Sequence, residues 1–471
     1  MKKSFFISTA IDYPSEKPHL GHCLEKIQAD VLARYKRLQG FDVYFSIGTD
    51  EHGLKIQRYA QKANKKPQEF VDEISGYFKD LWKLLNISNN DFIRTTEKRH
   101  EKVVWEIIKK IHEKGDIYKG QYKGRYCVDC ESYYLIKDLE EGNLCPVHHK
   151  PAEIIEEETY FFRMAKYQKQ LLKHIKENKN FIIPESKRNE ILNRLKEPLQ
   201  DLSITRKEVK WGVPFPFGKN LTLFVWIDAL INYLTTINYL DNKKFKKFWP
   251  ADVHVIGKDI VWHHSVIWSS LLLSLGLPLP KTIFVHGFIT LGGQKMSKSL
   301  RNTADPFEII KEYGTDAVRY FLLAEFSAVE DGDFTWEKFK TRYNADLANG
   351  LGNFASRVSA LRHQFSEAKL PKIDNDINKK IEETKKITAR KLEAFKFNES
   401  LAAIWDLIAF GDKYINQTQV WKITGQKSKN QIISNLLAIL NSVAVLLAPF
   451  LPATSAKISQ LKKGEILFPR L

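Results

Sequence analysis

The chain has 471 residues, more than one hydrophobic core normally serves, so we expect several domains. Hydrophobic residues make up 43% and charged residues 27%, proportions typical of a globular protein, and four cysteines are too few for a disulfide framework. We expect no membrane-spanning helix and no signal peptide, and therefore a cytoplasmic protein.

The formal net charge of +17 is strongly basic. Clustered Lys and Arg side chains suit a polyanionic partner, because they neutralise phosphates and release counterions. A Lys-rich surface that only keeps the protein solvated accounts for the same charge. Charge alone therefore leaves both interpretations open.

The first 115 residues are predicted to form half of an α/β domain. Residues 4–10 predict a buried strand, the periodic apolar positions of 22–39 a helix, and 41–48 a second strand. Strand, helix and strand in such a short stretch form a βαβ unit and predict a parallel sheet. Further helices are predicted at 67–85 and 98–114.

Residues 116–220 differ in composition from the segment before them. Tyr and Gly alternate, cysteines occur and acidic runs interrupt the basic background, which predicts an inserted module. The α/β alternation then resumes over 221–291. Its predicted elements are a strand at 221–226, a helix at 228–238, a strand at 253–257, a helix at 259–275 and a strand at 282–286. We therefore expect one parallel sheet interrupted by an insertion.

Residues 292–335 are predicted to contain a basic loop and linking helices. Asp305-Pro306 pairs an N-cap residue with proline at the first helical position, and it predicts a helix to about 325. Residues 336–471 are predicted to form an all-α bundle, because periodic apolar positions dominate there. The predicted helices are 337–363, 373–393, 399–419 and 428–449.

Two short segments suit a nucleotide. His19-Leu20-Gly21-His22 stands where a predicted strand meets a helix, and helix N-termini bind phosphate. Two histidines there could donate to phosphate oxygens, although histidines that only cap the helix fit the same pattern. Farther on, 292–299 combines glycines with Lys295 and Lys298, which suits a loop closing over a triphosphate or simply a solvated basic loop.

Together these segments resemble the two nucleotide-binding motifs of class I aminoacyl-tRNA synthetases. Similarity to the methionyl-tRNA synthetase family covers nearly the whole chain and is sharpest at four segments: Ile11 to Pro14, Asp50 to Gly53, Val225 to Leu230 and Gly257 to Val261. Asp12 and Leu230 depart from the family, because many relatives carry proline there. This leaves the local backbone shape open.

The resemblance implies a Rossmann-like catalytic sheet and an ATP-dependent enzyme. It would activate L-methionine to methionyl-adenylate with release of pyrophosphate, using Mg²⁺ with ATP, and transfer the methionine to tRNA(Met). Two other hypotheses are a nucleotidyltransferase acting on a small substrate and a tRNA-binding protein that has lost catalysis. The helical domain and the chain length argue against the nucleotidyltransferase, and the intact histidines and lysines argue against loss of catalysis.

The resemblance also implies roles, position by position. The methionine pocket would comprise Ile11, Tyr13, Trp226, Ala229, Tyr233, Ile260 and His264, with Asp50 holding the ammonium group. The ATP site would comprise His19, Gly21, His22, Gly257, Asp259, Lys295, Ser297 and Lys298, with Asp259 on the ribose. Of these, the catalytic residues would be His19, His22, Lys295 and Lys298.

A metal motif lies in the insertion. Cys127, Cys130, Cys145 and His148 follow a C-x2-C-x14-C-x2-H pattern, and four N/S ligands in two close pairs suit a structural Zn²⁺. His149 is an alternative fourth ligand. The methionyl family carries a zinc knuckle in this insertion, so we expect one Zn²⁺ per chain.

The predicted bundle contains residues whose family counterparts read the tRNA anticodon. These are Asn353 and Arg357, one turn apart on one helix, and Trp421. Splayed bases are read by hydrogen bonds and aromatic stacking. For Asn353 and Arg357, a solvated face or an interhelical hydrogen bond is the alternative. No β-barrel dimerisation domain is visible, so we expect a monomer.

Overall fold

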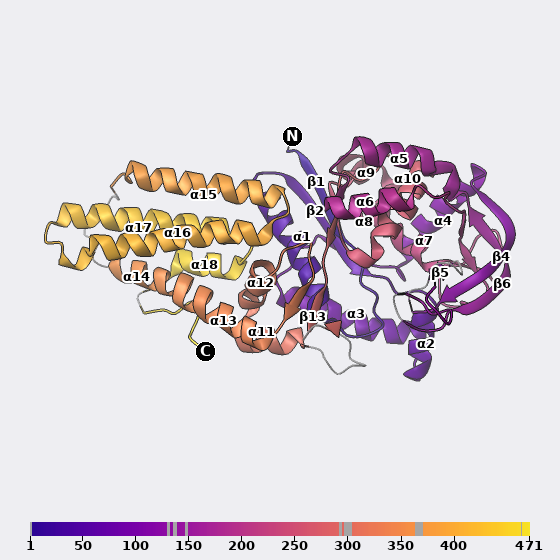
Figure 1. The fold of residues 1–471 in the computed structure, drawn as a ribbon, viewed down its shortest axis with the longest axis horizontal. Coiled ribbons are helices and arrows are strands. Elements are labelled where there is room, and N and C mark those ends of the chain that lie inside the picture. Colours follow the sequence, from indigo (N-terminus) through magenta and orange to yellow (C-terminus); the bar gives the residue numbers. More distant parts are fainter. Residues whose placement is uncertain are drawn as a thin grey trace. The chain divides into compact units, whose positions relative to one another are not determined.

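A computed structural model describes residues 2–129, 132–134, 139–146, 149–291, 294–295, 304–362, 371–462 and 464–471 (Figure 1). The chain divides into two compact units. Unit 1 comprises Met1–Pro18, Gly40–Asp80 and Asn89–Val285, and unit 2 comprises His19–Gln39, Leu81–Ser88 and His286–Leu471. Each unit is described separately.

Unit 1 is built on a six-stranded sheet with the order β3-β2-β1-β11-β12-β7. The strands are β1 (Ser4–Thr9), β2 (Asp42–Thr49), β3 (Asp91–Arg94), β7 (Ile182–Ile183), β11 (Val253–Gly257) and β12 (Ile283–His286). β1 pairs in parallel with β2 and β11, β2 with β3, and β12 with β7. The predicted parallel sheet is therefore present, with nearly continuous apolar strands because helices cover it.

The strand order reverses at β1, because β2 lies on one side of it and β11 on the other. In parallel α/β sheets ligands bind at such a switch point, outside the carboxyl ends of the strands. Three predicted site segments lie there: Ile11 to Tyr13 after β1, Asp50 after β2, and Gly257 at the end of β11. This arrangement is internal to unit 1.

The range 116–220 forms a four-stranded antiparallel sheet of order β5-β4-β6-β8. Its strands are β4 (Ile117–Cys127), β5 (Ser132–Tyr134), β6 (Glu153–Phe162) and β8 (Leu202–Ser203). Helices α5 (Gln168–Glu177) and α6 (Glu185–Arg194) flank β7, which returns from within this range to the parallel sheet. The two-residue β7 is too short to be recognised from the sequence.

The strand predicted at 221–226 is wrong as a member of the parallel sheet. Only β10 (Thr222–Leu223) is extended, and it pairs antiparallel with β9 (Thr205–Arg206). The chain then turns into α7 (Val225–Leu230) and α8 (Asn232–Thr236). A short apolar run fits a buried strand and a buried helix equally well, and periodicity cannot distinguish them.

Two other helices of unit 1, α4 (Lys98–Glu113) and α10 (Ser269–Ser274), lie in ranges predicted to be helical, whereas α2 (Leu54–Lys62) and α9 (Lys243–Phe248) were not predicted. The predicted α3 (Pro67–Leu84) runs from unit 1 into unit 2. The helix predicted at 259–275 is not uniform. It consists of a 3₁₀ turn η4 (Lys258–Ile260), a π-helical segment η5 (His263–Trp268) and α10.

Unit 2 begins with α1 (Leu20–Leu38) and continues with the strands β13 (Ile289–Leu291), β14 (Gln294–Lys295) and β15 (Gly332–Phe334). The Asp305 carboxylate accepts a hydrogen bond from the Phe307 N–H, so it caps α11 (Pro306–Tyr313) as predicted. Gly314, with φ of 85°, separates α11 from α12 (Thr315–Ala324). Its positive φ explains why the predicted single helix is two.

The bundle of unit 2 contains α13 (Trp336–Arg342), the π-helical η7 (Tyr343–Gly352), α14 (Asn353–Arg362), α15 (Asn375–Glu393), α16 (Phe397–Thr418), α17 (Gln426–Leu447) and α18 (Pro452–Gln460). α15, α16 and α17 lie side by side (Figure 1). By length and composition α17 could span a membrane, an exception to our expectation. It is mainly a core helix, because it packs against α14, α15, α16 and α18.

Candidate active site

The histidines of the first motif cap the helix that they begin. His19 Nδ1 accepts from the Gly21 N–H at 3.1 Å, and His22 Nδ1 accepts from the His19 N–H at 3.2 Å. Glycine at position 21 leaves room for this ring, because a Cβ there would lie 2.9 Å from the His19 ring and the ring would have to shift. The histidines therefore do cap the helix, as one of the two interpretations of the motif predicted, and these hydrogen bonds orient both rings.

The pKa of His22 lies well below its ordinary value, chiefly because of burial and then because of His19 and Lys26. A neutral imidazole has one hydrogen, and Nδ1 of His22 is an acceptor. Its hydrogen is therefore on Nε2. In this tautomer His22 can donate one hydrogen bond to an anionic oxygen.

A buried ionic cluster connects α1 with the strand that precedes the second motif. Glu25 pairs with Lys26 at 2.7 Å and with His286 Nε2 at 3.1 Å. Burial would raise the pKa of Glu25, but Lys26 and His286 hold it below its ordinary value. His286 ends β12, and the chain continues into β13, which pairs with β14. Lys295 ends β14, whereas Ser297 and Lys298 fall outside the described residues.

The segment after β2 carries Asp50, which is 5% exposed. Its backbone N–H donates to the Asp12 carbonyl at 2.8 Å, and the Asp12 N–H donates to the Gly48 carbonyl at 2.8 Å. These bonds extend the β1–β2 ladder past the strand ends. They bring Ile11 and Tyr13 beside Asp50, and Tyr13 Oη donates to the His52 carbonyl at 2.8 Å.

The other predicted pocket residues come from two helical segments of unit 1. Trp226 and Ala229 lie on α7, Tyr233 on α8, and Ile260 and His264 at η4 and η5. Tyr233 Oη lies 2.7 Å from His264 Nε2, and His264 Nδ1 lies 3.0 Å from the Ile260 carbonyl oxygen. Because a carbonyl only accepts, His264 Nδ1 carries the hydrogen. In the neutral form of the ring, Nε2 then accepts from the Tyr233 hydroxyl.

Sequence reasoning missed His263, whose ring stacks on Trp226 at 3.9 Å between centroids. Burial, with smaller contributions from His264 and Arg194, lowers the pKa of His263 to about 3. The ring is therefore neutral and acts as an aromatic surface. The adjacent pair of histidines was the only sequence signal for it.

Gly257 is the last residue of β11, and Asp259 lies two residues later in η4. Gly257 is buried and Asp259 is exposed on η4. An exposed carboxylate at this edge of the sheet can accept hydrogen bonds from ribose hydroxyls. Its position agrees with the ligand-binding edge of a parallel sheet.

Two of the predicted zinc ligands lie within the described residues. Cys127 ends β4 and Cys145 lies between β5 and β6, and both side chains are buried. Cys145 Sγ lies 3.5 Å from Tyr134 Oη on β5, the strand that pairs with β4. Cys130 and His148 fall outside the described residues. Among the residues that the structure describes, no group of three or more His, Cys, Asp or Glu side chains could hold a metal ion.

The alternative ligand His149 is directed elsewhere. Its Nδ1 lies 2.7 Å from Glu140 Oε2, and its side chain is 68% exposed. The His149 ring is therefore held by Glu140, whereas His148 falls outside the described residues.

The three predicted anticodon residues lie in the bundle. Asn353 is exposed, and Trp421 in η8 (Val420–Lys422) is 54% exposed. Arg357 donates to Asp412 at 2.7 Å and to Asn416 at 2.6 Å. The interhelical hydrogen bond is thus present. It holds the guanidinium beside the end of α16, which leads directly to Trp421.

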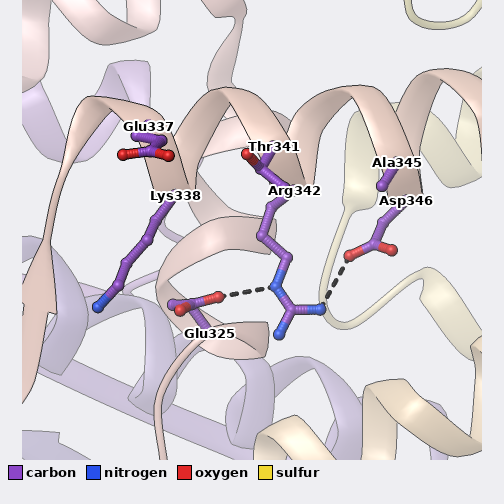
Figure 2. A pocket seen from close by; sticks show the side chains of 7 residues that line it. All are labelled: Glu325, Glu337, Lys338, Thr341, Arg342, Ala345 and Asp346. Carbon is purple, nitrogen blue, oxygen red and sulfur yellow. Dashed lines mark hydrogen bonds and ion pairs between the residues drawn. The ribbon is translucent and has the colours of Figure 1, made fainter.

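A surface pocket of about 300 Å³ lies elsewhere, on α13 and η7 of unit 2 (Figure 2). Arg342 crosses it and pairs with Glu325 at 2.7 Å and Asp346 at 3.1 Å. The hydrogen bond to Glu325 is the main reason why the pKa of Arg342 is raised. None of the predicted site residues lines this pocket.

Comparisons with known proteins find similar sequences over nearly the whole chain. Residues 5–150 and 137–359 match the family described as tRNA synthetases class I (M), and 374–469 match the anticodon-binding domain of tRNA ligase. The methionine–tRNA ligase of Caldanaerobacter subterraneus is 43% identical over 100% of this chain and 79% of that protein. The enzyme of Thermotoga maritima is 44% identical over 96% and 74%.

A solved structure is also similar. Mycobacterium tuberculosis methionyl-tRNA synthetase in complex with methionyl-adenylate has a TM-score of 0.93 and 35% identity, covering 99% of this chain and 97% of that one. The similarity therefore includes the α/β region and the helical region. Both are present in the complex with the reaction intermediate.

Proposed function

The chain belongs to the methionine–tRNA ligase family of class I tRNA synthetases, and from this we propose which residues carry each step of its reaction. It is a ligase. It activates L-methionine with ATP to methionyl-adenylate, releases pyrophosphate, and transfers the methionine to the 3′ end of its tRNA. No protein nucleophile is needed, so positioning and electrostatics supply the rate.

Methionine binds at the carboxyl ends of β1 and β2. Two hydrogen bonds between segments far apart in the sequence carry this assignment: Tyr13 Oη donates to the carbonyl of His52, two residues after Asp50, and Tyr233 Oη lies 2.7 Å from His264 Nε2. Asp50 holds the ammonium group. Trp226, Ala229 and the aromatic rings enclose the thioether, because a polarizable sulfur packs well against aromatic edges.

ATP binds with its phosphates at the N-terminus of α1. His22, neutral with its hydrogen on Nε2, and His19 donate to phosphate oxygens. Lys295, Ser297 and Lys298 contact the departing pyrophosphate, Mg²⁺ accompanies the nucleotide, and Asp259 accepts from the ribose. Gly257 lets the nucleoside approach the backbone. These donors stabilise charge that develops on the phosphates in the transition state.

Zinc is proposed to hold the insertion, with Cys127, Cys130, Cys145 and His148 as its ligands. The buried thiols of Cys127, at the end of β4, and of Cys145, 3.5 Å from the Tyr134 hydroxyl of β5, support this role. A closed set of four ligands supplies folding free energy rather than chemistry. In the bundle, Asn353, Arg357 and Trp421 bind the anticodon of tRNA(Met), and the chain acts as a cytoplasmic monomer.

The test is ATP–pyrophosphate exchange with each amino acid in turn. We expect exchange with methionine alone, and subsequent charging of tRNA(Met). Exchange driven by another amino acid would overturn the pocket assignment. Tyr233→Phe is a matched variant, because it removes only the hydroxyl that donates to His264 and should raise the KM for methionine while leaving that for ATP unchanged.

A further inference from the structure

A buried carboxylate on α7 receives hydrogen bonds from two histidines of unit 1. His52 Nδ1 lies 2.7 Å from Asp228 Oδ2, and His100 Nε2 lies 2.8 Å from Asp228 Oδ1. The three side chains are at most 5% exposed. Because a carboxylate only accepts, each of these ring nitrogens carries a hydrogen that points at Asp228.

Asp228 is ionised at neutral pH. Burial alone would raise its pKa, but His52 and His100 bring the pKa of Asp228 down to about 2. The far side of the His100 ring is also held, because its Nδ1 lies 2.9 Å from Thr235 Oγ1 on α8. The carboxylate therefore links α4, which carries His100, with α7 and with the segment after β2.

His52 stands two residues after Asp50, so this link acts on the segment proposed to bind the ammonium group. The same segment is fixed from other sides. The carbonyl of His52 accepts from Tyr13 Oη at 2.8 Å, and the carbonyl of Glu51 accepts from Trp211 Nε1 at 2.6 Å. Of these bonds, only the one from the His52 side chain reaches α7, the helix of the thioether wall.

We propose that Asp228 is a positioning residue for methionine recognition: through His52 it holds the ammonium-binding segment at Asp50 in register with α7. This inference rests on the proposed function. Trp226 and Ala229 flank Asp228 on α7, so the same helix supplies the wall and the anchor. The buried carboxylate then helps to set the distance between the ammonium-binding segment and the thioether wall.

The test is Asp228→Asn in ATP–pyrophosphate exchange. The amide nitrogen cannot accept, so one histidine loses its partner and the Asp50 segment shifts. We expect the KM for methionine to rise about 10- to 100-fold, since a misplacement of about 1 Å can cost about 10²-fold. The KM for ATP should stay within about twofold of wild type.

Two competitive inhibitors distinguish positioning from general damage. L-Methioninol keeps the ammonium group, and 4-(methylthio)butanoate lacks it. In Asp228→Asn the inhibition constant of methioninol should rise with the KM for methionine, while that of the amine-free acid should not. An equal rise for both inhibitors, or an unchanged KM for methionine, would overturn the positioning role.

Further variants test the same role in case Asp228→Asn does not fold. In His52→Asn the amide nitrogen replaces the ring Nδ1 as donor, so this variant should stay close to wild type, whereas His52→Ala should behave like Asp228→Asn. Asp116→Asn is the matched control, because Asp116 is an equally buried carboxylate bonded to Lys166 and Ser274, and it should not change the KM for methionine. A wild type without methionine-dependent exchange would refute the proposed function itself.

Discussion

Asp30 of α1 and Arg319 of α12 form an ion pair of 2.8 Å in which both side chains are fully buried. The Asp30 carboxylate also accepts from Arg34 and Ser88, and the Arg319 guanidinium donates to the carbonyl of Phe450 at 2.7 Å. The pair lies within unit 2. It connects the helix that starts with the histidine motif to the helical part of the chain.

Removing one partner of this pair should destabilise unit 2 strongly. We expect Arg319→Met to lower the free energy of unfolding by about 3–5 kcal/mol, because it leaves a buried carboxylate without its main counter-charge. Urea unfolding followed by circular dichroism measures this change. Lys385→Met is the control, because its partner Glu382 and Lys385 itself are both exposed to solvent, and we expect little change in the free energy of unfolding.

The protein should lose stability in acid over a defined range. Burial by itself would raise the pKa of Asp30. The positive charges of Arg319 and Arg34 lower it by more than burial raises it, so the pKa of Asp30 lies below its ordinary value. The pKa of Asp228 is lowered to about 2. A lowered pKa contributes stability above the unfolded value of about 3.9 and loses it as the pH falls through the folded value. The thermal unfolding midpoint should therefore decrease as the pH is lowered below about 4. In Asp228→Asn this decrease should be smaller.

Lys298→Ala should reduce the rate of pyrophosphate exchange by about 10²- to 10³-fold, because one positive charge that stabilises the transition state is lost. Binding of methionine, followed by tryptophan fluorescence, should be unchanged. Lys311→Ala removes an exposed lysine of α11 and should leave the exchange rate at the wild-type value. Equal rates for wild type and Lys298→Ala would remove this lysine from the mechanism.

Trp421→Ala should raise the KM for tRNA in the charging reaction about 5- to 150-fold and spare pyrophosphate exchange. Stacking of one base on an aromatic ring contributes about 1–3 kcal/mol. Trp421→Phe retains a stacking surface and should lose little. Trp105→Ala is the control, since Trp105 is 46% exposed in unit 1. A parallel loss in exchange would contradict a role limited to the anticodon.

Metal analysis should find about one zinc per chain, as expected for a single closed site of four ligands. Cys145→Ser should reduce that content and lower the thermal stability, since metal binding supplies folding free energy. Cys23→Ser, which changes the cysteine outside the motif, should keep its zinc. A stable protein without zinc would refute the knuckle.

Much of the fold could be predicted because its signals are local. β1, α1 and β2 follow from apolar runs and helical periodicity, and the Asp305-Pro306 start of α11 follows from cap chemistry. The strand predicted at 221–226 failed because its apolar residues suit either state. The two-residue β7 was missed, since its extended conformation depends on pairing with β12.

The site residues were predicted through motifs and a family resemblance, and their roles remain predictions. Neither source indicated His263 or the partners of Asp228. His52 and Asp228 lie 176 positions apart, and His100 and Asp228 lie 128 apart. A single aspartate inside an apolar run was the sequence signal, but no local pattern could say which side chains would satisfy it.

The sequence by itself determined β1, α1, β2, the cap of α11 and the motifs that identify the family, because each depends on residues close together along the chain. The tertiary structure alone decided the strand order around β1, the hydrogen-bonded tautomers of His22 and His264, and the bridge at Asp228. These depend on which buried polar groups meet after folding. A buried charge must find its partners wherever they lie in the chain, and only the folded structure shows them.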